Sequence, residues 1–447
     1  MKKLILLLLF VPLSANLHAQ TKDSVFSFTV KQAIAFALEN QTDVQNAKLD
    51  AEISKAQVKE ILGMGLPQLN SSFDLKDFEE IPTSLIPGEF FGGETGSFIP
   101  VKFGTRWNAT GTISASQLIF DPTYLIGVKA TKTLKELSEK NLNRTELETA
   151  VAVTKAYYNL LLLTERKKAI DANLQRIQKL YDDTRILNIN GFVEKLDLDR
   201  VKVTLNNVTT EIEKFNRLMA VSNKVLKYQM GMKQSATLEA IETINATELK
   251  KMAVSVEKYD VSERIEYSIL ETQKKLQEYN IKRYRSGRYP SLVAYGNLST
   301  SAQRQDFDFF DSDKGWYPTG IIGATLSLPL FDGFQKHNKI KQGKLSLRKL
   351  SNEIERFEEA ASIEVSSNRD ALINSVSSLN IQEQNLELAN EIYTTSKLKY
   401  DQGVGSNLEV LDAETSLKDS QANYFNALYD VMISKIDLDK SMGKFIY

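Results

Sequence analysis

The sequence is written twice, and this duplication constrains the fold more than any other feature. A glycine turn at Gly191 recurs at Gly403, 212 positions later (403 − 191). Each turn opens a helical pattern that ends at a Met-Gly pair, and these two pairs are also 212 positions apart. The pairs are Met230-Gly231 and Met442-Gly443. Two repeated copies can interleave in space and make one body.

The ends of the pattern divide the chain into four parts. A charged start, a short apolar run and a cleavage site predicted after Ala19 give a secretory signal peptide over residues 1–19. That apolar run is too short to cross the roughly 30 Å hydrocarbon core of a membrane as a helix. We predict a first copy over residues 20–231, a connecting segment over 232–260 and a second copy over 261–447.

The composition argues against catalysis and against nucleic-acid binding. The net charge is −1, with 56 basic and 57 acidic residues, so no basic field favours nucleic acid. The chain has no cysteine, which excludes disulfides, zinc-thiolate sites and cysteine nucleophiles. Its two histidines, His18 and His337, offer no metal cluster and little acid-base chemistry. We expect no enzyme activity, no metal and no cofactor.

Two stretches in each copy alternate between apolar and polar residues. In the first of them Leu69, Phe73 and Leu75 alternate with polar residues. Segments of about ten residues with this alternation are the weak signature of membrane-spanning β-strands. The predicted strands are residues 68–78, 105–119, 291–301 and 316–329. The stretches between them, 80–104 and 302–315, are predicted to be surface loops. Their phenylalanines fit either an interfacial girdle or loop packing.

The rest of each copy is helical. Residues 30–63 and 261–287 show helical spacing and stop at glycine and proline. Longer patterns run from 120 to 187 and from 333 to 400, and about 65 residues of helix reach on the order of 100 Å. The returning helices carry apolar seams with a seven-residue repeat, which predicts winding around neighbouring helices. The seam of the first copy contains Val201, Leu205, Val208, Ile212, Phe215, Met219, Ser222, Leu226 and Gln229.

Four strands per chain cannot close a barrel, and lipid does not tolerate an open sheet edge. Closure must come from other copies of the chain in cyclic symmetry. Two chains would supply eight strands and three would supply twelve, which leaves room for a channel. We therefore predict an α+β membrane protein in which a shared transmembrane β-barrel continues into a long α-helical coiled-coil barrel.

At this point the residues resemble the outer membrane efflux proteins of the TolC type, over nearly the whole mature chain. The resemblance is carried by the tip turns, the strand entries and the strand exits. These are Tyr400-Asp401-Gln402-Gly403-Val404-Gly405, Val410-Leu411-Asp412-Ala413, Gly191…Asp197, Leu66-Pro67-Gln68-Leu69, Tyr289-Pro290-Ser291-Leu292, Phe120-Asp121 and Phe331-Asp332-Gly333. The resemblance implies a homotrimer with a twelve-stranded barrel and a periplasmic helical tunnel. It also implies docking with a periplasmic adaptor, the membrane fusion protein, and an inner-membrane transporter.

The resemblance also assigns a gate at the tips of the helices. The family's constriction carboxylates fall on Glu409 and Asp412, and members of its hydrogen-bonded latch fall on Tyr400 and Asp197. The latch arginine of the family is Gly405 in this chain. Rings of carboxylates favour cations. However, Ser406 to Glu409 also fits a helix capping box, so capping explains the two carboxylates equally well.

The tip turns have a second expected role. The resemblance places the adaptor-docking tips at Gly191, Phe192, Gly403 and Val404. A tight turn that needs positive φ at glycine accounts for the same residues, and one turn can serve both purposes.

The function that these patterns favour is a passive duct for small-molecule efflux in the outer membrane. Opening would be a mechanical step, an outward shift of the paired helices at residues 180–200 and 395–415. One alternative keeps the duct but has it export proteins in type I secretion. Another is a periplasmic coiled-coil scaffold without a pore, which would dissolve in water, whereas the alternating strands predict extraction only with detergent.

Overall fold

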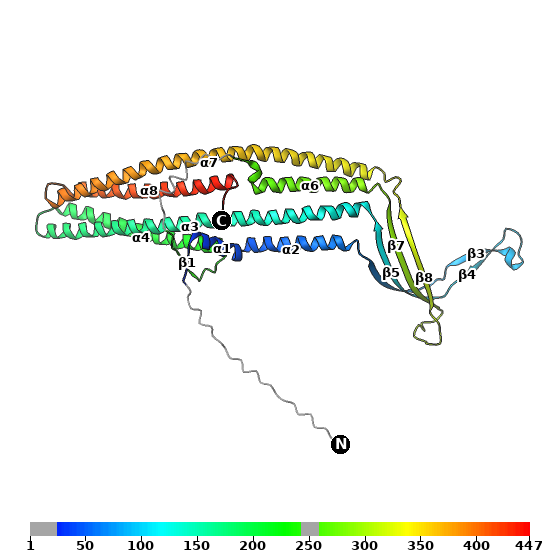
Figure 1. The fold of residues 1–447 in the computed structure, drawn as a ribbon. Helices are drawn as coiled ribbons and strands as arrows, with labels where there is room; N and C mark the ends of the chain where they lie inside the picture. Colours follow the sequence, from blue (N-terminus) through cyan, green and yellow to red (C-terminus); the bar gives the residue numbers. More distant parts are fainter. Residues whose placement is uncertain (1–24, 243–258) are drawn as a thin grey trace, which may run out of the picture.

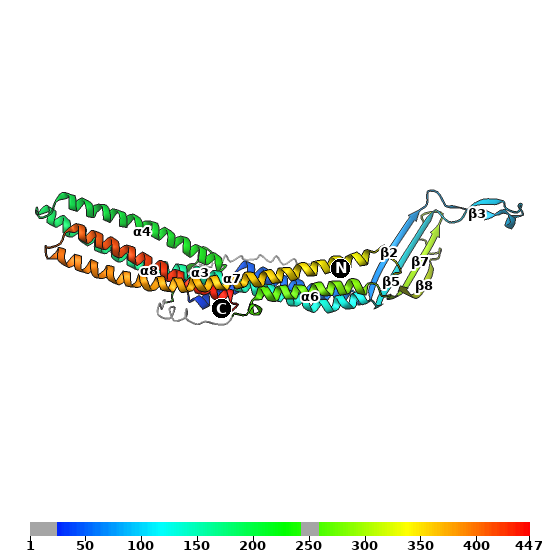
Figure 2. The same ribbon diagram turned by 90° about the horizontal axis from the view of Figure 1, so that it is seen from above.

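A computed structural model of the protein describes residues 25–242 and 259–447. The predicted signal peptide, residues 1–19, lies outside the described residues, and so does much of the predicted connecting segment 232–260. Figures 1 and 2 show one elongated bundle of helices with a sheet at one end and two helix turns at the other. No helix in the part of the chain that the structure describes is both long and apolar enough to cross a membrane.

Four long helices form two hairpins, one in each copy. The first hairpin is α3 (Pro122–Ile189) with α4 (Lys195–Gln229), and the second is α7 (Gln335–Asp401) with α8 (Asn407–Ser441). The Asp121 carboxylate caps α3 by accepting the backbone N–H of Thr123 at 2.6 Å, and Pro122 occupies the first turn. The 68 residues of α3 span on the order of 100 Å.

The predicted seam of the first returning helix is buried against its neighbours. Along α4, five of its positions are buried and the others are partly buried. The fully or nearly fully buried ones are Val201, Val208, Phe215, Ser222 and Leu226. The seven-residue spacing therefore identified the face of α4 that packs.

The short helices correct one expectation. The stretch predicted as a single helix over residues 30–63 is two helices, α1 (Val30–Asn40) and α2 (Thr42–Gly63). Gln41 breaks them with extended backbone (φ −71°, ψ 131°), and its side chain caps α2 by accepting the Val44 N–H at 3.1 Å. In the second copy, η2 (Val261–Glu263) and α6 (Ile265–Ser286) meet at Arg264 with φ −77° and ψ 131°. A break of the same form thus occurs in both copies.

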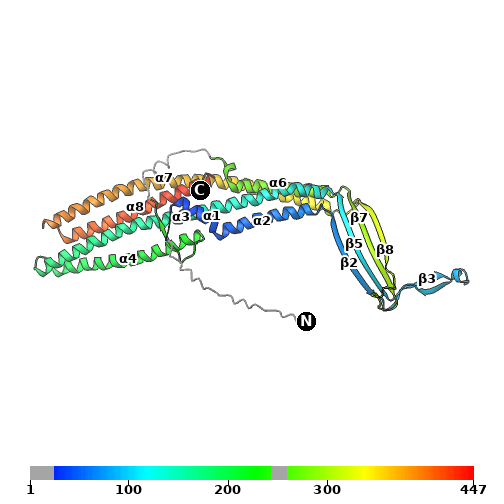
Figure 3. The same ribbon diagram turned by 60° about the horizontal axis from the view of Figure 1, so that its bottom comes forward.

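Four antiparallel strands form the main sheet, in the order β2-β5-β7-β8. They are β2 (Gln68–Asp77), β5 (Trp107–Phe120), β7 (Ser291–Arg304) and β8 (Tyr317–Ser327). Figure 3 shows them side by side. Each overlaps a predicted strand, although β7 runs three residues further than expected, to Arg304. The helices α2, α3, α6 and α7 join these strands and contact one another in the same order.

The two faces of this sheet differ in chemistry. The register places Ser72, Thr112, Ser299 and Thr319 in one row across all four strands, so that face carries hydroxyl groups. The opposite face carries exposed apolar side chains, with exposed fractions from 51 to 94%. These side chains are Leu69, Phe73, Ile113, Leu298 and Ile322. The polar and apolar faces follow from the period-two alternation of the strands.

Four further strands lie outside the main sheet. The predicted loop at 80–104 contains an antiparallel hairpin of β3 (Thr83–Pro87) and β4 (Phe98–Lys102), joined by η1 (Gly88–Phe91). This corrects the loop prediction, which had no alternation to reveal the pairing. Figure 1 shows the hairpin projecting past the sheet. The short β1 (Val25–Phe28) pairs in parallel with β6 (Thr237–Ala240).

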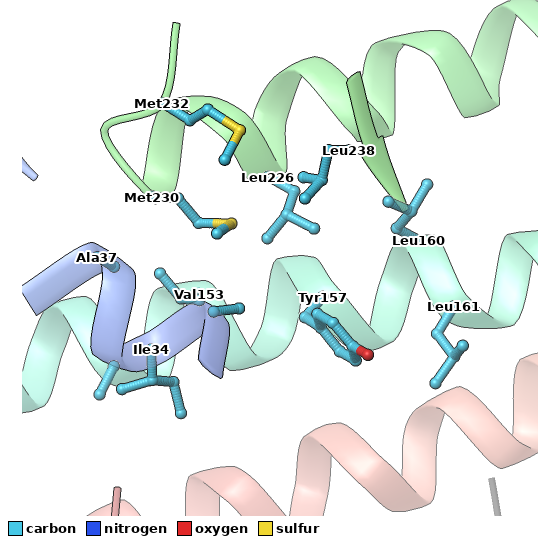
Figure 4. Close-up of a cluster of buried hydrophobic side chains, with 12 residues drawn as sticks. Ile34, Ala37, Val153, Tyr157, Leu160, Leu161, Leu226, Met230, Met232 and Leu238 are labelled. Atoms are coloured by element: carbon cyan, nitrogen blue, oxygen red, sulfur yellow. The ribbon is translucent and has the colours of Figure 1, made fainter. Parts of the chain in front are cut away.

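The largest buried cluster lies where α1, α3, α4 and β6 meet (Figure 4), and Figure 1 shows these elements midway along the bundle. Val153, Tyr157 and Leu226 are at most 1% exposed. The Tyr157 hydroxyl donates to the Phe28 carbonyl at 2.8 Å and accepts the Glu242 N–H at 3.2 Å. Burial raises the pKa of Tyr157, so its phenol stays neutral and the two bonds persist at neutral pH. This cluster fixes the β1–β6 pair against the helices.

Candidate functional site

The two helix turns lie together at the end of the bundle opposite the sheet (Figure 1). Gly191 has φ +79° and Gly403 has φ +74°, a conformation that favours glycine. The turns bond alike: Phe192 N–H donates to the Leu187 carbonyl at 2.9 Å, and Val404 N–H to the Lys399 carbonyl at 3.0 Å. Phe192 and Val404 are 77% and 74% exposed. The predicted tip residues therefore present two apolar side chains at one end of the molecule.

The two predicted gate carboxylates lie on the exposed face of the first turns of α8. Glu409 and Asp412 are both exposed, whereas the neighbouring Val410 and Ala413 are buried in the seam. The Ser406 hydroxyl accepts the Glu409 N–H at 3.2 Å, which is one half of the predicted capping box. The carboxylates therefore sit at the positive end of the helix dipole with their oxygens open to solvent.

Tyr400 links the second hairpin to the first. Its hydroxyl lies 3.4 Å from the hydroxyl of Thr184, which is fully buried on α3. The Lys397 ammonium lies 5.3 Å from the centre of the Tyr400 ring and 2.6 Å from the Asp401 carboxylate. Tyr400 is thus held from both sides, through its hydroxyl and through its ring.

Asp197 also links the two hairpins, but through its backbone carbonyl and not through its side chain. Its carboxylate lies 3.4 Å from the Arg200 guanidinium on the same helix. Its backbone carbonyl accepts a hydrogen bond from the side-chain amide of Asn407 at 3.3 Å, which ties the start of α4 to the start of α8. Tyr400 and Asp197 therefore both join the hairpins, each to its own partner.

Sequence reasoning missed the most buried polar contact between the hairpins. The Glu414 side chain is 4% exposed and binds Arg176 of α3, with a nitrogen–oxygen distance of 2.7 Å. The Arg176 Nε also donates to both Glu414 oxygens, at 2.9 and 3.0 Å. The Asn173 amide donates to the same carboxylate, and the Arg176 guanidinium lies 5.4 Å from the centre of the Tyr393 ring. We call Asn173, Arg176, Tyr393 and Glu414 the interhairpin cluster.

The interhairpin cluster keeps its tyrosine neutral. Burial raises the pKa of Tyr393, and the negative charge of Glu414 raises it further. One sequence signal could have located Glu414: it lies four residues after Val410 and three before Leu417, on the same face of the helix as these two apolar residues. The partner could not be found in the same way, because 238 residues separate Arg176 from Glu414.

Gly405, where the resemblance predicts the latch arginine, lies where the backbone leaves little room for a side chain. A Cβ there would lie 2.9 Å from the Tyr400 nitrogen and 3.0 Å from the Lys399 Cβ. The Gly405 N–H also donates to the Lys399 carbonyl at 3.1 Å. The turn therefore folds back onto the end of α7 at a glycine.

We expect Gly405→Ala and Gly405→Arg to destabilise this turn, because the added carbon collides with backbone that ends a helix. Overpacking of this kind costs about 1–3 kcal/mol. Hydrogen exchange of the amides at 398–408 measures the loss. The control is Val404→Ala beside it, which changes an exposed side chain and should alter stability by no more than about 0.5 kcal/mol. Greater protection of these amides in the arginine variant than in the parent would contradict the clash.

Known proteins share this sequence pattern and this fold. Residues 270–444 match the family described as outer membrane efflux protein. The probable efflux pump outer membrane protein TtgC of Pseudomonas putida is 21% identical over 415 residues, covering 93% of this chain and 82% of that protein. Outer membrane protein TolC of Vibrio cholerae is 22% identical over 349 residues, covering 74% of this chain and 76% of that protein.

A solved structure has the same fold over the residues that the structure describes. The outer membrane protein VceC from Vibrio cholerae superposes with a TM-score of 0.71 at 16% identity, covering 93% of this chain and 96% of that chain. The duplicated helical hairpins, the four-stranded sheet that they join and the match over residues 270–444 lead to one conclusion. The chain is similar to the outer membrane efflux proteins, in sequence over residues 270–444 and in fold over the residues that the structure describes.

Proposed function

We propose that this outer membrane protein forms a homotrimeric channel, the exit duct of a tripartite export system for small molecules. The observation that carries the proposal is the four-stranded sheet, with a hydroxyl-bearing face, an apolar face and free edges at β2 and β8. Three copies would join these edges into twelve strands. The apolar face would then meet lipid and the polar face would line water.

The helices extend the duct away from the membrane. Because α2, α3, α6 and α7 follow the order of the strands, joined copies would continue the barrel as a tube of helices. The chain itself would hydrolyse nothing and bind no cofactor, so transport would be driven by an inner-membrane transporter. The exposed Phe192 and Val404 at the tips are where a periplasmic adaptor would dock. The word efflux in the names of similar proteins supports small-molecule export.

Glu409 and Asp412 would form carboxylate rings at the mouth, since both are exposed at the tip of α8. Opening would move the hairpin ends at 180–200 and 395–415 outward. The contacts that resist this movement inside one chain are those of Tyr400 with Thr184, of Asn407 with Asp197 and of the interhairpin cluster.

Single-channel recording in a planar bilayer tests the channel and its filter together. We expect the parent to form channels that prefer cations. The variant Glu409→Gln/Asp412→Asn should lose that preference several-fold, because the substitutions neutralise both carboxylates in each of the three chains of the proposed trimer. The control is Asp199→Asn, an exposed carboxylate in the first turns of α4.

Each result has a distinct meaning. Equal ion preference in the parent and the double variant would make Glu409 and Asp412 helix caps rather than a filter. A processed chain that dissolves in water as a monomer, without detergent and without conductance, would contradict the channel itself.

A further inference from the structure

A cleft of about 400 Å³ opens where the main sheet meets the helices in the second copy. It lies between the start of β7 and the segment from the end of β8 to the start of α7. Its lining combines apolar and basic side chains, with Asp332 as its acidic member. The residues used below are Arg288, Leu330, Phe331, Phe334, Lys336 and His337.

The apolar side of the cleft continues the apolar face of the sheet. On β8 that face carries Ile322 and Leu326, and the same alternation leads beyond the strand to Leu328 and Leu330. Leu330 and Phe331 are 88% and 77% exposed. Since the apolar face of the main sheet is proposed to meet lipid, the exposed apolar side chains that continue it would meet lipid as well.

Phe334 is held in this patch against its backbone preference. With φ +63° it is the sole non-glycine residue with positive φ among residues 25–242 and 259–447. Such a conformation is strained for a bulky residue. Its ring packs edge-on against Phe331 at 5.5 Å yet remains 65% exposed, so packing within the chain does not bury it. Two aromatic rings with this placement suit the boundary between lipid and water.

The polar side of the cleft is basic. The Lys336 ammonium lies 3.6 Å from the Asp332 carboxylate, which also accepts the Lys336 N–H at 3.1 Å. Arg288 is exposed, and its side chain has no hydrogen-bond or ion-pair partner in the part of the chain that the structure describes, although its backbone N–H donates to the Arg285 carbonyl at 3.2 Å. Arg285 is exposed one turn earlier. The guanidinium of Arg288 is therefore free to bind an anion beside the apolar patch.

The first copy provides an internal comparison. With the offset of 223 that relates Pro67 to Pro290, Arg288 corresponds to Gly65. With the offset of 211 that relates Asp121 to Asp332, Lys336 and His337 correspond to Leu125 and Ile126. The duplicated junction is therefore basic in one copy only, and the fold of the junction does not itself require these charges.

We propose that this cleft binds the phosphate of a phospholipid headgroup from the periplasmic side of the outer membrane. Arg288 and Lys336 hold the phosphate through charge-assisted hydrogen bonds, while Leu330, Phe331 and Phe334 lie against the acyl chains. The proposal rests on the proposed orientation of the sheet in lipid. A second copy of the chain is the less suitable occupant, because the cleft lies between the turn at Arg288 and the segment 329–337 of one chain, and its two basic groups complement a phosphate.

Native mass spectrometry of the detergent-purified full-length protein tests the site, with dihexanoyl phosphatidylglycerol as the probe. We expect the parent to retain the lipid. The variant Arg288→Gln/Lys336→Gln should bind it at least about tenfold more weakly, since each basic side chain near an anionic lipid contributes to the binding free energy. The matched control is Lys344→Gln/Arg348→Gln, which removes two exposed charges further along α7.

Two further probes separate the source of the phosphate. Inorganic phosphate should displace the lipid only at much higher concentration, because it lacks acyl chains, and dihexanoylglycerol, which lacks phosphate, should bind weakly. Equal loss of lipid in both double variants would overturn the proposal, and so would displacement by phosphate at the same concentration as the lipid. Conductance of Arg288→Gln/Lys336→Gln should remain as in the parent, so failure of this site is distinguishable from failure of the channel.

Discussion

Replacing Glu414 with alanine is expected to destabilise the tip of the bundle by about 3 kcal/mol, the lower end of the range for breaking a buried ion pair. The reason is that Arg176 and Asn173 would lose the carboxylate that both of them bind. The lower end applies because the Arg176 side chain is 26% exposed and can recover part of its hydration. Hydrogen exchange of the amides at 173–180 and 410–417 measures the opening free energy of both helices at the contact.

Two variants test whether the loss of stability in Glu414→Ala arises because its ion pair with Arg176 is buried. Glu211→Ala removes a carboxylate that lies 3.1 Å from Lys418 in a pair about one-third exposed, so it should cost about 0–1 kcal/mol. Arg176→Leu/Glu414→Leu removes both charges and should be more stable than Glu414→Ala. If the amides at 173–180 and 410–417 are as well protected from exchange in Glu414→Ala as in Glu211→Ala, the interhairpin cluster does not hold the hairpins together.

Gly231→Ala and Gly443→Ala are expected to be the most damaging glycine substitutions in the chain, at about 3 kcal/mol or more each. Both glycines have positive φ, +69° and +75°. A Cβ at Gly231 would lie 2.5 Å from the Asn40 carbonyl oxygen, and one at Gly443 would lie 2.7 Å from the Glu263 carbonyl oxygen. Each substitution therefore adds a collision with backbone to the strain of the left-handed conformation. The melting temperature of the detergent-solubilised protein measures the loss.

The tip glycines are the matched controls. Gly191 and Gly403 have similar φ values, but a Cβ at either would have no atom within 4 Å outside its immediate neighbours. Alanine there should cost only the conformational strain, about 1–2 kcal/mol. Equal melting temperatures for Gly231→Ala and Gly191→Ala would mean that the break at Gln41 moves aside readily and does not fix α4 against α1 and α2.

Local pattern predicted much of this fold. The alternation at Leu69, Phe73 and Leu75 located β2 and its apolar face, and the seven-residue seam located the buried face of α4. The tip glycines and the exposed positions of Glu409 and Asp412 also followed from their neighbours in sequence. These features depend on contacts within a few turns or strand positions, which is the range over which periodicity is informative.

Contacts between segments that are distant in the sequence could not be predicted from it. Helical spacing continues through Gln41, but the structure breaks the helix there, at a point that packs against Gly231, 190 positions later (231 − 41). The parallel pairing of β1 with β6, the hairpin at 83–102 and the partner of Glu414 share this property. By itself the sequence determined the duplication, the length of the long helices, the buried face of α4 and the apolar face of the main sheet. The tertiary structure decided which elements meet, because periodicity reports that a face is buried but carries no information about the residues that bury it.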